Sequence, residues 1–143
     1  MIRIYTDGIY DLFHRGHVES LNLCKSLYPN TYLIVGVIND KNATAYKRAP
    51  IYNESDRYTI IENLKCVDKL VRDAPLIVTQ KFLEEHQIDL VVHGFANPED
   101  SLKQTDFYKV PKELKKFKEV AYYNGISTTD IISKITEAQS AIK

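Results

Sequence analysis

The sequence lacks tryptophan and has two cysteines, no net charge and no long hydrophobic run. Nineteen basic residues balance nineteen acidic ones, which argues against general nucleic-acid binding because that function needs a basic surface. The longest apolar runs, such as residues 32–38, are far too short to cross a bilayer. Cys24 and Cys66 have no CxxC partner, so we expect free thiols rather than a disulfide or a metal site.

What remains is an ordinary globular composition, with 44% hydrophobic and 27% charged residues. A chain of 143 residues is long enough for one domain and short for two. We find no internal repeat or linker and therefore predict a single domain over residues 1–143. The N-terminus shows no secretory segment, so we expect a cytoplasmic location.

Hydrophobic patterns predict alternating strands and helices. We expect strands at residues 2–5, 31–38, 70–73 and 89–94, with a weak fifth strand at 120–123. We expect helices at residues 16–28, from 53 onward, at 79–85 and at 127–138, and an irregular polar stretch at 95–116. This alternation predicts an α/β fold, with a Rossmann-like parallel sheet and helices on both faces. Ligands of such sheets bind at the carboxyl ends of the strands.

The segment His14-Arg15-Gly16-His17 lies where the first strand passes into the first helix. Gly16 allows close backbone approach, and the start of a helix offers unpaired N–H groups to an anion. Both histidines of this HxGH motif can reach one phosphate, and imidazoles can stabilise the charge that builds up during phosphoryl transfer. The alternatives are a metal pair completed by Asp7 or Asp11, or two surface histidines.

A second cluster, from Gly125 to Asp130, gathers hydroxyl groups and backbone N–H groups at the start of the last predicted helix. Such a cluster suits a polyphosphate. The alternative is a plain capping box between Ser127 and Asp130.

Four segments, TDGIYDLFHRGH, YLIVGV, ESDRY and GISTTDII, occur in this order. Together they resemble the cytidylyltransferase family, which makes CDP-choline, CDP-ethanolamine and CDP-glycerol and belongs to the HxGH nucleotidyltransferase superfamily. The similarity spans residues 2–135 and is closest to the choline and ethanolamine branches. The resemblance implies transfer of CMP from CTP to phosphoethanolamine or phosphocholine in phospholipid head-group synthesis, with release of pyrophosphate. It further implies Mg²⁺ bound with CTP and a homodimer. The long amphipathic membrane-binding helix of the animal choline enzymes is missing from this sequence.

The resemblance also assigns roles to residues. The implied catalytic residues are His14, His17 and Lys47. The implied nucleotide-binding residues are Gly8, Ile9, Gly16, Arg57, Gly94, Ile126, Ser127, Thr128 and Thr129. The implied acceptor-binding residues are Asp7, which would pair with an amine head group, and Tyr108. Without the resemblance, the sequence alone favours ordinary structural roles for four of these residues. Lys47 would be an exposed loop lysine, Arg57 a helix-surface residue, Asp7 a turn residue and Tyr108 a residue that packs within a loop.

Three departures from the family's pattern involve four residues. Leu76 replaces a tryptophan that faces the quaternary ammonium in the choline enzymes, so a smaller amine is favoured. Phe95 and Ala96 replace an acidic pair, and Tyr122 replaces an arginine that supports the nucleotide. Two rival functions are therefore kept: an adenylyltransferase of the same superfamily, and a non-catalytic nucleotide-binding module.

Overall fold

The computed structural model describes residues 1–142, and Lys143, the last residue of the predicted domain, lies outside the described residues. Five parallel strands form one sheet with the order β3-β2-β1-β4-β5. Their bounds are Ile2–Gly8 for β1, Thr31–Val37 for β2, Lys69–Val71 for β3, Leu90–His93 for β4 and Phe117–Glu119 for β5. The chain adds β2 and β3 on one side of β1 and then β4 and β5 on the other, so the strand order switches direction at β1. This topology confirms the predicted Rossmann-like α/β fold.

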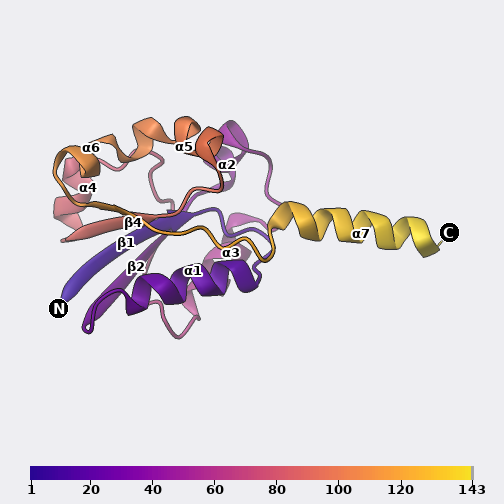
Figure 1. Ribbon diagram of the computed structural model, residues 1–143, viewed down its shortest axis with the longest axis horizontal. Helices are drawn as coiled ribbons and strands as arrows, with labels where there is room; N and C mark the ends of the chain where they lie inside the picture. Colours follow the sequence, from indigo (N-terminus) through magenta and orange to yellow (C-terminus); the bar gives the residue numbers. More distant parts are fainter. Residues whose placement is uncertain (143) are drawn as a thin grey trace.

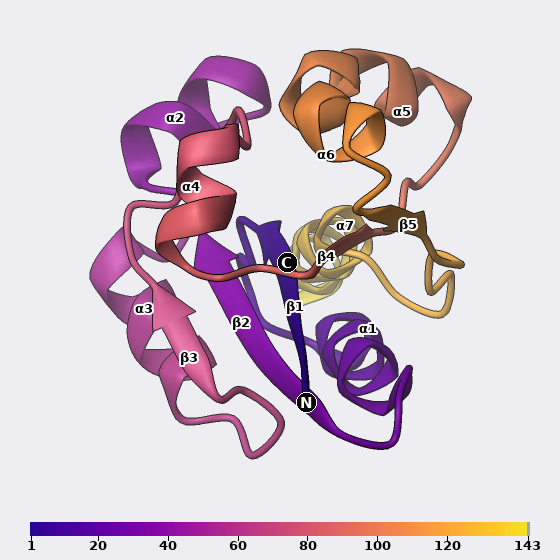
Figure 2. The same cartoon turned by 90° about the vertical axis from the view of Figure 1, so that its left-hand side faces the viewer.

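Helices cover both faces of this sheet (Figures 1 and 2). Helices α1 and α3 pack on one face, while α4 and the segment from η1 to α6 pack on the other. The helix bounds are Arg15–Ser26 for α1, Asp40–Tyr46 for α2, Glu54–Glu62 for α3, Gln80–Glu85 for α4, Pro98–Lys103 for α5, Thr105–Tyr108 for the 3-10 helix η1, Lys109–Glu113 for α6 and Thr128–Ile142 for α7.

The two hydrophobic cores follow from strand geometry. Successive side chains of a strand point to opposite faces, so Ile4 and Leu33 join the core under α1 and α3. Their neighbours Tyr5 and Ile34 join the core under α4. All four side chains are fully buried, which explains why β1 and β2 are almost continuously apolar.

The shared register brings polar strand ends together. Asp7 of β1 pairs with Gly36 of β2, and Tyr5 of β1 pairs with Val91 of β4. Asp7 therefore lies near His93, the last residue of β4, at the carboxyl edge of the sheet. The loop that follows β1 leads directly to His14, the N-cap of α1.

Local capping signals explain the helix starts that the sequence predicted correctly. Asn53 caps α3 by accepting a hydrogen bond from the backbone N–H of Asp56 at 2.8 Å. Thr79 caps α4 in the same way, with Phe82 as the donor at 3.1 Å. Each cap satisfies a backbone N–H that the first helical turn leaves unpaired.

The prediction of an irregular stretch at residues 95–116 is wrong, because α5, η1 and α6 lie there. Asn97 caps α5 by accepting a hydrogen bond from Asp100 N–H at 2.8 Å, and Pro98 takes the first helical position. Both are ordinary signals for a helix start. The Lys-rich composition of the segment concealed them.

Two further differences from the sequence prediction concern the fifth strand and helix α2. The fifth strand lies at Phe117–Glu119 and not at residues 120–123, because Phe117 pairs with Val91 of β4. Helix α2 was not predicted at all, although Asn39 caps it by accepting from Asn42 N–H at 2.7 Å.

Helix α7 projects away from the rest of the molecule (Figure 1). None of its residues is buried, and Ile135 is 59% exposed. Within residues 1–142, no helix combines the length and the apolar character needed to span a membrane.

Candidate active site

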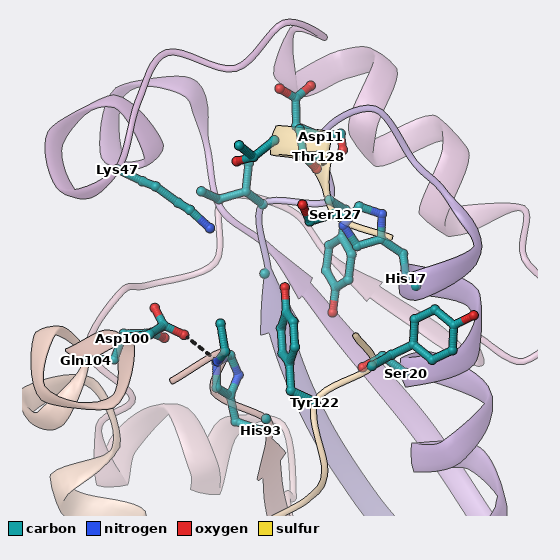
Figure 3. A pocket seen from close by; sticks show the side chains of 18 of the residues that line it. Asp11, His17, Ser20, Lys47, His93, Asp100, Gln104, Tyr122, Ser127 and Thr128 are labelled. Carbon is teal, nitrogen blue, oxygen red and sulfur yellow. Dashed lines mark hydrogen bonds between the residues drawn. The ribbon is translucent and has the colours of Figure 1, made fainter. Parts of the chain in front are cut away.

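A cavity of about 510 Å³ opens at the carboxyl edge of the sheet (Figure 3). The loop after β1, the end of α2, helix α5 and the segment leading into α7 all contribute to its walls. Most of the residues predicted for the site line this cavity: Asp7, Gly8, Ile9, His14, Gly16, His17, Lys47, Gly94, Ile126, Ser127, Thr128 and Thr129. The two exceptions are Arg57 and Tyr108.

The imidazoles of His14 and His17 are stacked at the start of α1, with ring centroids 3.9 Å apart. Nδ1 of His14 accepts a hydrogen bond from the backbone N–H of Gly16 at 2.9 Å. Nδ1 of His17 accepts from the backbone N–H of His14 at 3.2 Å. An accepting ring nitrogen carries no proton, so the proton of each neutral ring lies on Nε2. The backbone thereby leaves each histidine with an Nε2–H donor.

The surroundings of the histidines keep both rings neutral. Burial, together with smaller contributions from the nearby His14 and Lys47, lowers the pKa of His17 to about 3, while the carboxylate of Asp11 acts in the opposite direction. Burial also lowers the pKa of His14, although the carboxylate of Asp130 acts in the opposite direction. Both rings are therefore uncharged hydrogen-bond donors near pH 7.

Gly16 allows the start of α1 and the start of α7 to meet. A Cβ atom at this position would lie 2.7 Å from Cε1 of His14 and 3.0 Å from the carbonyl oxygen of Ile126. Both distances are shorter than ordinary contacts, so a larger residue would push the segment before α7 away from the histidine pair.

Lys47 is the C-cap residue of α2, and its side chain extends into the cavity from the side opposite His17 (Figure 3). Within residues 1–142 its ammonium group forms no ion pair. A lysine in this position can place a point charge between two phosphate groups.

Ser127 and Asp130 form the capping box of α7. The Ser127 hydroxyl oxygen accepts from Asp130 N–H at 3.1 Å, and the Asp130 carboxylate accepts from Ser127 N–H at 3.0 Å. The structural alternative considered for this motif is therefore present, and Ser127 still lines the cavity. Its hydroxyl hydrogen is left available for an anion. Thr128, by contrast, donates its hydroxyl hydrogen to the carbonyl oxygen of Asp11 at 3.0 Å.

Asp7 lines the cavity at the carboxyl end of β1 and is only 6% exposed. Its Oδ1 atom accepts a hydrogen bond from the Tyr108 hydroxyl at 2.6 Å and lies 3.5 Å from Nδ1 of His93. Within residues 1–142, Oδ2 of Asp7 has no hydrogen-bond partner and stays available to a ligand. Burial of the ring, and then the neighbouring carboxylate of Asp7, raise the pKa of Tyr108 well above its ordinary value, so its hydroxyl stays protonated and keeps donating.

The acceptor-binding role that the resemblance implies for Tyr108 stays a prediction. Its side chain is 2% exposed and lines the small second cavity, together with Asp7, rather than the large one. It packs between His93, Phe95 and Phe117 and holds the carboxylate of Asp7. The burial follows from η1, which the sequence did not predict and which turns Tyr108 toward the sheet.

The helix-surface alternative for Arg57 is wrong, because the side chain is fully buried. The side chain does not line the cavity, and the nucleotide-binding role that the resemblance implies stays a prediction. Its guanidinium donates to the carbonyl oxygens of Ile9, Ile38 and Tyr52 and pairs with Asp40 at 2.7 Å. Three of its four hydrogen bonds hold the backbone around the site.

One wall of the cavity escaped sequence prediction. Helix α5 contributes Asp100 and Lys103, the turn after it contributes Gln104, and β4 contributes His93 (Figure 3). Asp100 accepts hydrogen bonds from Gln104 Nε2 and from Ala96 N–H, at 2.8 and 3.0 Å. His93 could have been found as a polar residue at the carboxyl end of a buried strand.

The four residues that depart from the family's pattern lie in different surroundings, and Ala96 lines the cavity. Tyr122 lines the cavity and is 42% exposed (Figure 3). Phe95 packs into the core beside His93 and Phe117. Leu76 lines a second cavity of about 10 Å³ directly behind Asp7.

Among residues 1–142, no group of three or more His, Cys, Asp or Glu side chains is arranged to hold a metal ion. The hydrogen bonds of the histidines fit anion binding, because each Nδ1 is already occupied by a backbone donor.

The sequence matches the model of the family described as cytidylyltransferase-like over residues 5–134. The chain belongs to the cytidylyltransferase-like family. This membership confirms the resemblance carried by the four sequence segments.

Individual members of the cytidylyltransferase-like family agree with this assignment. Choline-phosphate cytidylyltransferase A from Rattus norvegicus is 45% identical over 134 residues, which cover 94% of this chain and 36% of the relative. Ethanolamine-phosphate cytidylyltransferase from Mus musculus is 31% identical over 135 residues, covering 94% of this chain and 33% of the relative. The chain thus spans about a third of the length of these relatives.

A solved structure shares the fold of this cytidylyltransferase-like chain. The crystal structure of the lipopolysaccharide core biosynthesis protein from Thermoplasma volcanium GSS1 superimposes with a TM-score of 0.68 at 27% sequence identity. The match covers 87% of this chain and 99% of that one.

Proposed function

We propose that this chain transfers CMP from CTP to the phosphate of a small phospho-alcohol and releases pyrophosphate, in phospholipid head-group synthesis. The observation that carries the proposal is the stacked pair His14 and His17, whose hydrogen bonds assign an Nε2–H donor to each ring in one cavity. The names of the relatives, choline-phosphate and ethanolamine-phosphate cytidylyltransferases, support the reaction and its substrates.

In the proposed reaction, an oxygen of the acceptor's phosphate attacks the α-phosphorus of CTP in line with the leaving group. The bond from the α-phosphorus to the bridging oxygen breaks, and pyrophosphate leaves with that electron pair. Catalysis then depends on positioning and on neutralising charge. His14 and His17 donate to the oxygens of the α-phosphate as their charge builds up. No covalent intermediate is needed, and neither cysteine lines the cavity.

Lys47 and the start of α7 would hold the remaining phosphates. The Lys47 ammonium enters the cavity opposite the histidines and would bridge the nucleotide and the incoming phosphate (Figure 3). Ser127 and Thr129 would meet the β- and γ-phosphates beside the N-terminus of a 15-residue helix.

Mg²⁺ is proposed as part of the nucleotide substrate. Magnesium commonly keeps several waters and binds through substrate phosphates rather than through an all-protein cage. The hydroxyls of Ser127 and Thr129 and the ammonium of Lys47 would then bind the phosphate oxygens of the complex. When bound, the ion would neutralise charge on the leaving pyrophosphate.

The acceptor is proposed to be a phosphorylated amino-alcohol. Asp7 is a buried carboxylate in the wall of the cavity, and only one of its oxygens is held by Tyr108. A buried carboxylate favours a cationic partner, which an ammonium head group supplies.

Two head groups compete for this role. The cavity behind Asp7 measures about 10 Å³ and is lined by Leu76, so it offers neither the volume nor the tryptophan face that a trimethylammonium group would use. This observation favours phosphoethanolamine. The greater identity to choline-phosphate cytidylyltransferases, 45% against 31%, favours phosphocholine.

The deciding experiment measures pyrophosphate release with Mg²⁺ and CTP in the presence of phosphoethanolamine, phosphocholine or glycerol 3-phosphate. We expect turnover with an amine phosphate and none with glycerol 3-phosphate. The Asp7→Asn variant should raise KM for the amine acceptor and leave KM for CTP nearly unchanged, because Asp7 lies at the acceptor end.

The same assay separates the rival functions. Turnover with ATP in place of CTP would identify an adenylyltransferase. Binding of CTP without any pyrophosphate release would identify a non-catalytic module. A homodimer and a cytoplasmic location are proposed from the family resemblance, and light scattering during size-exclusion chromatography would test the former.

A further inference from the structure

Two buried charged side chains, Asp11 in the wall of the cavity and Arg57 outside it, hold one exposed segment. Asp11 is 6% exposed, and its carboxylate accepts from the backbone N–H groups of Ile51 and Tyr52 at 2.7 and 2.8 Å. It also accepts from the N–H of Leu12 at 3.1 Å. Charge-assisted bonds of this kind are roughly twice as strong as neutral ones.

Arg57 binds the same segment through a backbone carbonyl group. Its Nε donates to the carbonyl oxygen of Tyr52 at 3.1 Å, so Tyr52 is held at its N–H by Asp11 and at its carbonyl by Arg57. Nη1 of Arg57 donates to the carbonyl oxygen of Ile9 at 2.7 Å. Asp11 and Arg57 thereby bind residues 51–52 to the loop after β1. We call these two side chains, with the backbone groups that they bind, the clamp.

This clamp connects two parts of the cavity that are distant in sequence. Lys47 lies four residues before Ile51, in a stretch without regular structure between α2 and α3. The Asp11 end of the clamp lies three residues before His14. Asp11 also accepts the Thr128 hydroxyl at its carbonyl oxygen, which adds the start of α7 to the same junction.

The backbone around Asp11 is strained, and the clamp explains how it persists. Tyr10 and Leu12 have φ angles of 57° and 47°, in the left-handed region that side chains disfavour. Such conformations survive only where the surroundings over-determine them, and here bonds at Ile9, Asp11 and Leu12 do so.

We propose that Asp11 and Arg57 are positioning residues that set the place of the Lys47 ammonium relative to the histidine pair. They act through the backbone of residues 51–52 and do not themselves contact the reacting atoms. The proposal rests on the function proposed above, because it gives Lys47 the task of bridging phosphates.

A first test needs no substrate. In Asp11→Asn the side-chain amide places an NH₂ donor against one of the two backbone N–H groups, so the clamp loosens. Trypsin can cleave after Lys47 and Arg48, and we expect this cleavage to become about 10-fold faster, because a lost charge-assisted bond corresponds to about that factor. Asp68→Asn is the matched control, since Asp68 accepts from the N–H of Leu33 at 2.7 Å in a part of the sheet remote from Lys47. Equal cleavage rates in the two variants would overturn the clamp.

A second test is kinetic and uses a double-mutant cycle. We expect Asp11→Asn to lower kcat/KM for CTP by on the order of 10- to 100-fold, as a small misplacement of a charged group does. In a Lys47→Ala background the same substitution should have an effect of less than about 3-fold, because the group that it positions is gone. If the two effects multiply instead, Asp11 does not act through Lys47.

The two tests distinguish a failure of the proposed function from a failure of the positioning role. A wild-type protein without turnover would overturn the proposed function and, with it, the positioning role in catalysis. Faster tryptic cleavage of Asp11→Asn alone would still establish the mechanical tie between Asp11 and the Lys47 segment. Arg57→Lys serves as a second variant, because it keeps the charge and loses the planar fork that reaches Ile9 and Tyr52 together.

Discussion

Helices α1 and α7 both begin at the cavity, and they are held there in opposite ways. Helix α1 packs on the sheet through Leu21 and Cys24, which are 0% and 1% exposed. Helix α7 has no buried residue and projects from the molecule (Figure 1). The histidine donors of α1 are therefore fixed by the hydrophobic core. The hydroxyl groups at the start of α7 are held by hydrogen bonds, namely the capping box of Ser127 and the bond from Thr128 to the carbonyl oxygen of Asp11.

The difference predicts unequal stability costs in the two helices. Leu21→Ala should lower the free energy of unfolding by about 2–5 kcal/mol, because it leaves a cavity under α1. Ile135→Ala should change it by less than about 0.5 kcal/mol, since this side chain of α7 is 59% exposed. Urea unfolding followed by circular dichroism would compare the two variants. A loss above about 1 kcal/mol in Ile135→Ala would mean that α7 packs on a surface in solution, and the comparison would break down.

The chemistry should depend most on α1. His17→Ala removes one Nε2–H donor and should raise the activation barrier by about 2.7–4 kcal/mol, as the loss of one oxyanion donor does. Pyrophosphate release at saturating CTP would measure this as a drop in kcat. His86→Ala is the matched control, because His86 caps the end of α4 and does not line the cavity. Turnover of His17→Ala within a few-fold of the wild type would refute the role given to His17.

Burial of the His17 imidazole should also appear as a pH dependence of stability. The folded pKa is about 3 and the ordinary value is 6.5, so the unfolded chain takes up a proton first as the pH falls. This residue therefore makes the ligand-free protein less stable between pH 6.5 and about 3, by at most about 1.4 kcal/mol per pH unit. His17→Asn keeps an acceptor for the N–H of His14 and removes the titrating group.

Urea unfolding of the wild type and of His17→Asn at pH 4.5, 5.5, 6.5 and 7.5 would test this linkage. We expect the wild type to lose more stability than the variant below pH 6.5. Curves that stay parallel over the whole range would show that the imidazole of His17 is not desolvated in solution.

The contrast between α1 and α7 also explains which features the sequence could predict. Strands β1 and β2 and helix α1 follow from hydrophobic periodicity, because a buried element shows its burial in its sequence. The motif residues His14, His17 and Lys47 reach one cavity as predicted from the resemblance, since α1 and α2 follow adjacent strands at one edge of the sheet.

The features that the sequence did not predict depend on tertiary contacts. Arg57 lies on an ordinary helical stretch, and its complete burial follows only from the carbonyl groups that three separate loops turn toward it. The hydrogen bond from Tyr108 to Asp7 depends on η1, which the sequence did not predict. Helix α5 had usable local signals in Asn97 and Pro98, which the charged composition obscured.

The smallest predicted effects concern two helix caps, one that stabilises the fold and one that helps to bind the nucleotide. Thr79→Ala and Ser127→Ala each remove an N-cap hydroxyl that accepts from a backbone N–H at 3.1 Å. Thr79→Ala should lower the free energy of unfolding by about 1 kcal/mol, because α4 packs against the sheet and its start unfolds with the core. Ser127→Ala should leave global unfolding almost unchanged and raise KM for CTP several-fold, because the loosened start of α7 no longer presents its N–H groups to the phosphates. Equal stability losses in the two variants, with KM unchanged in Ser127→Ala, would mean that α7 belongs to the core and that its hydroxyl groups do not bind the nucleotide.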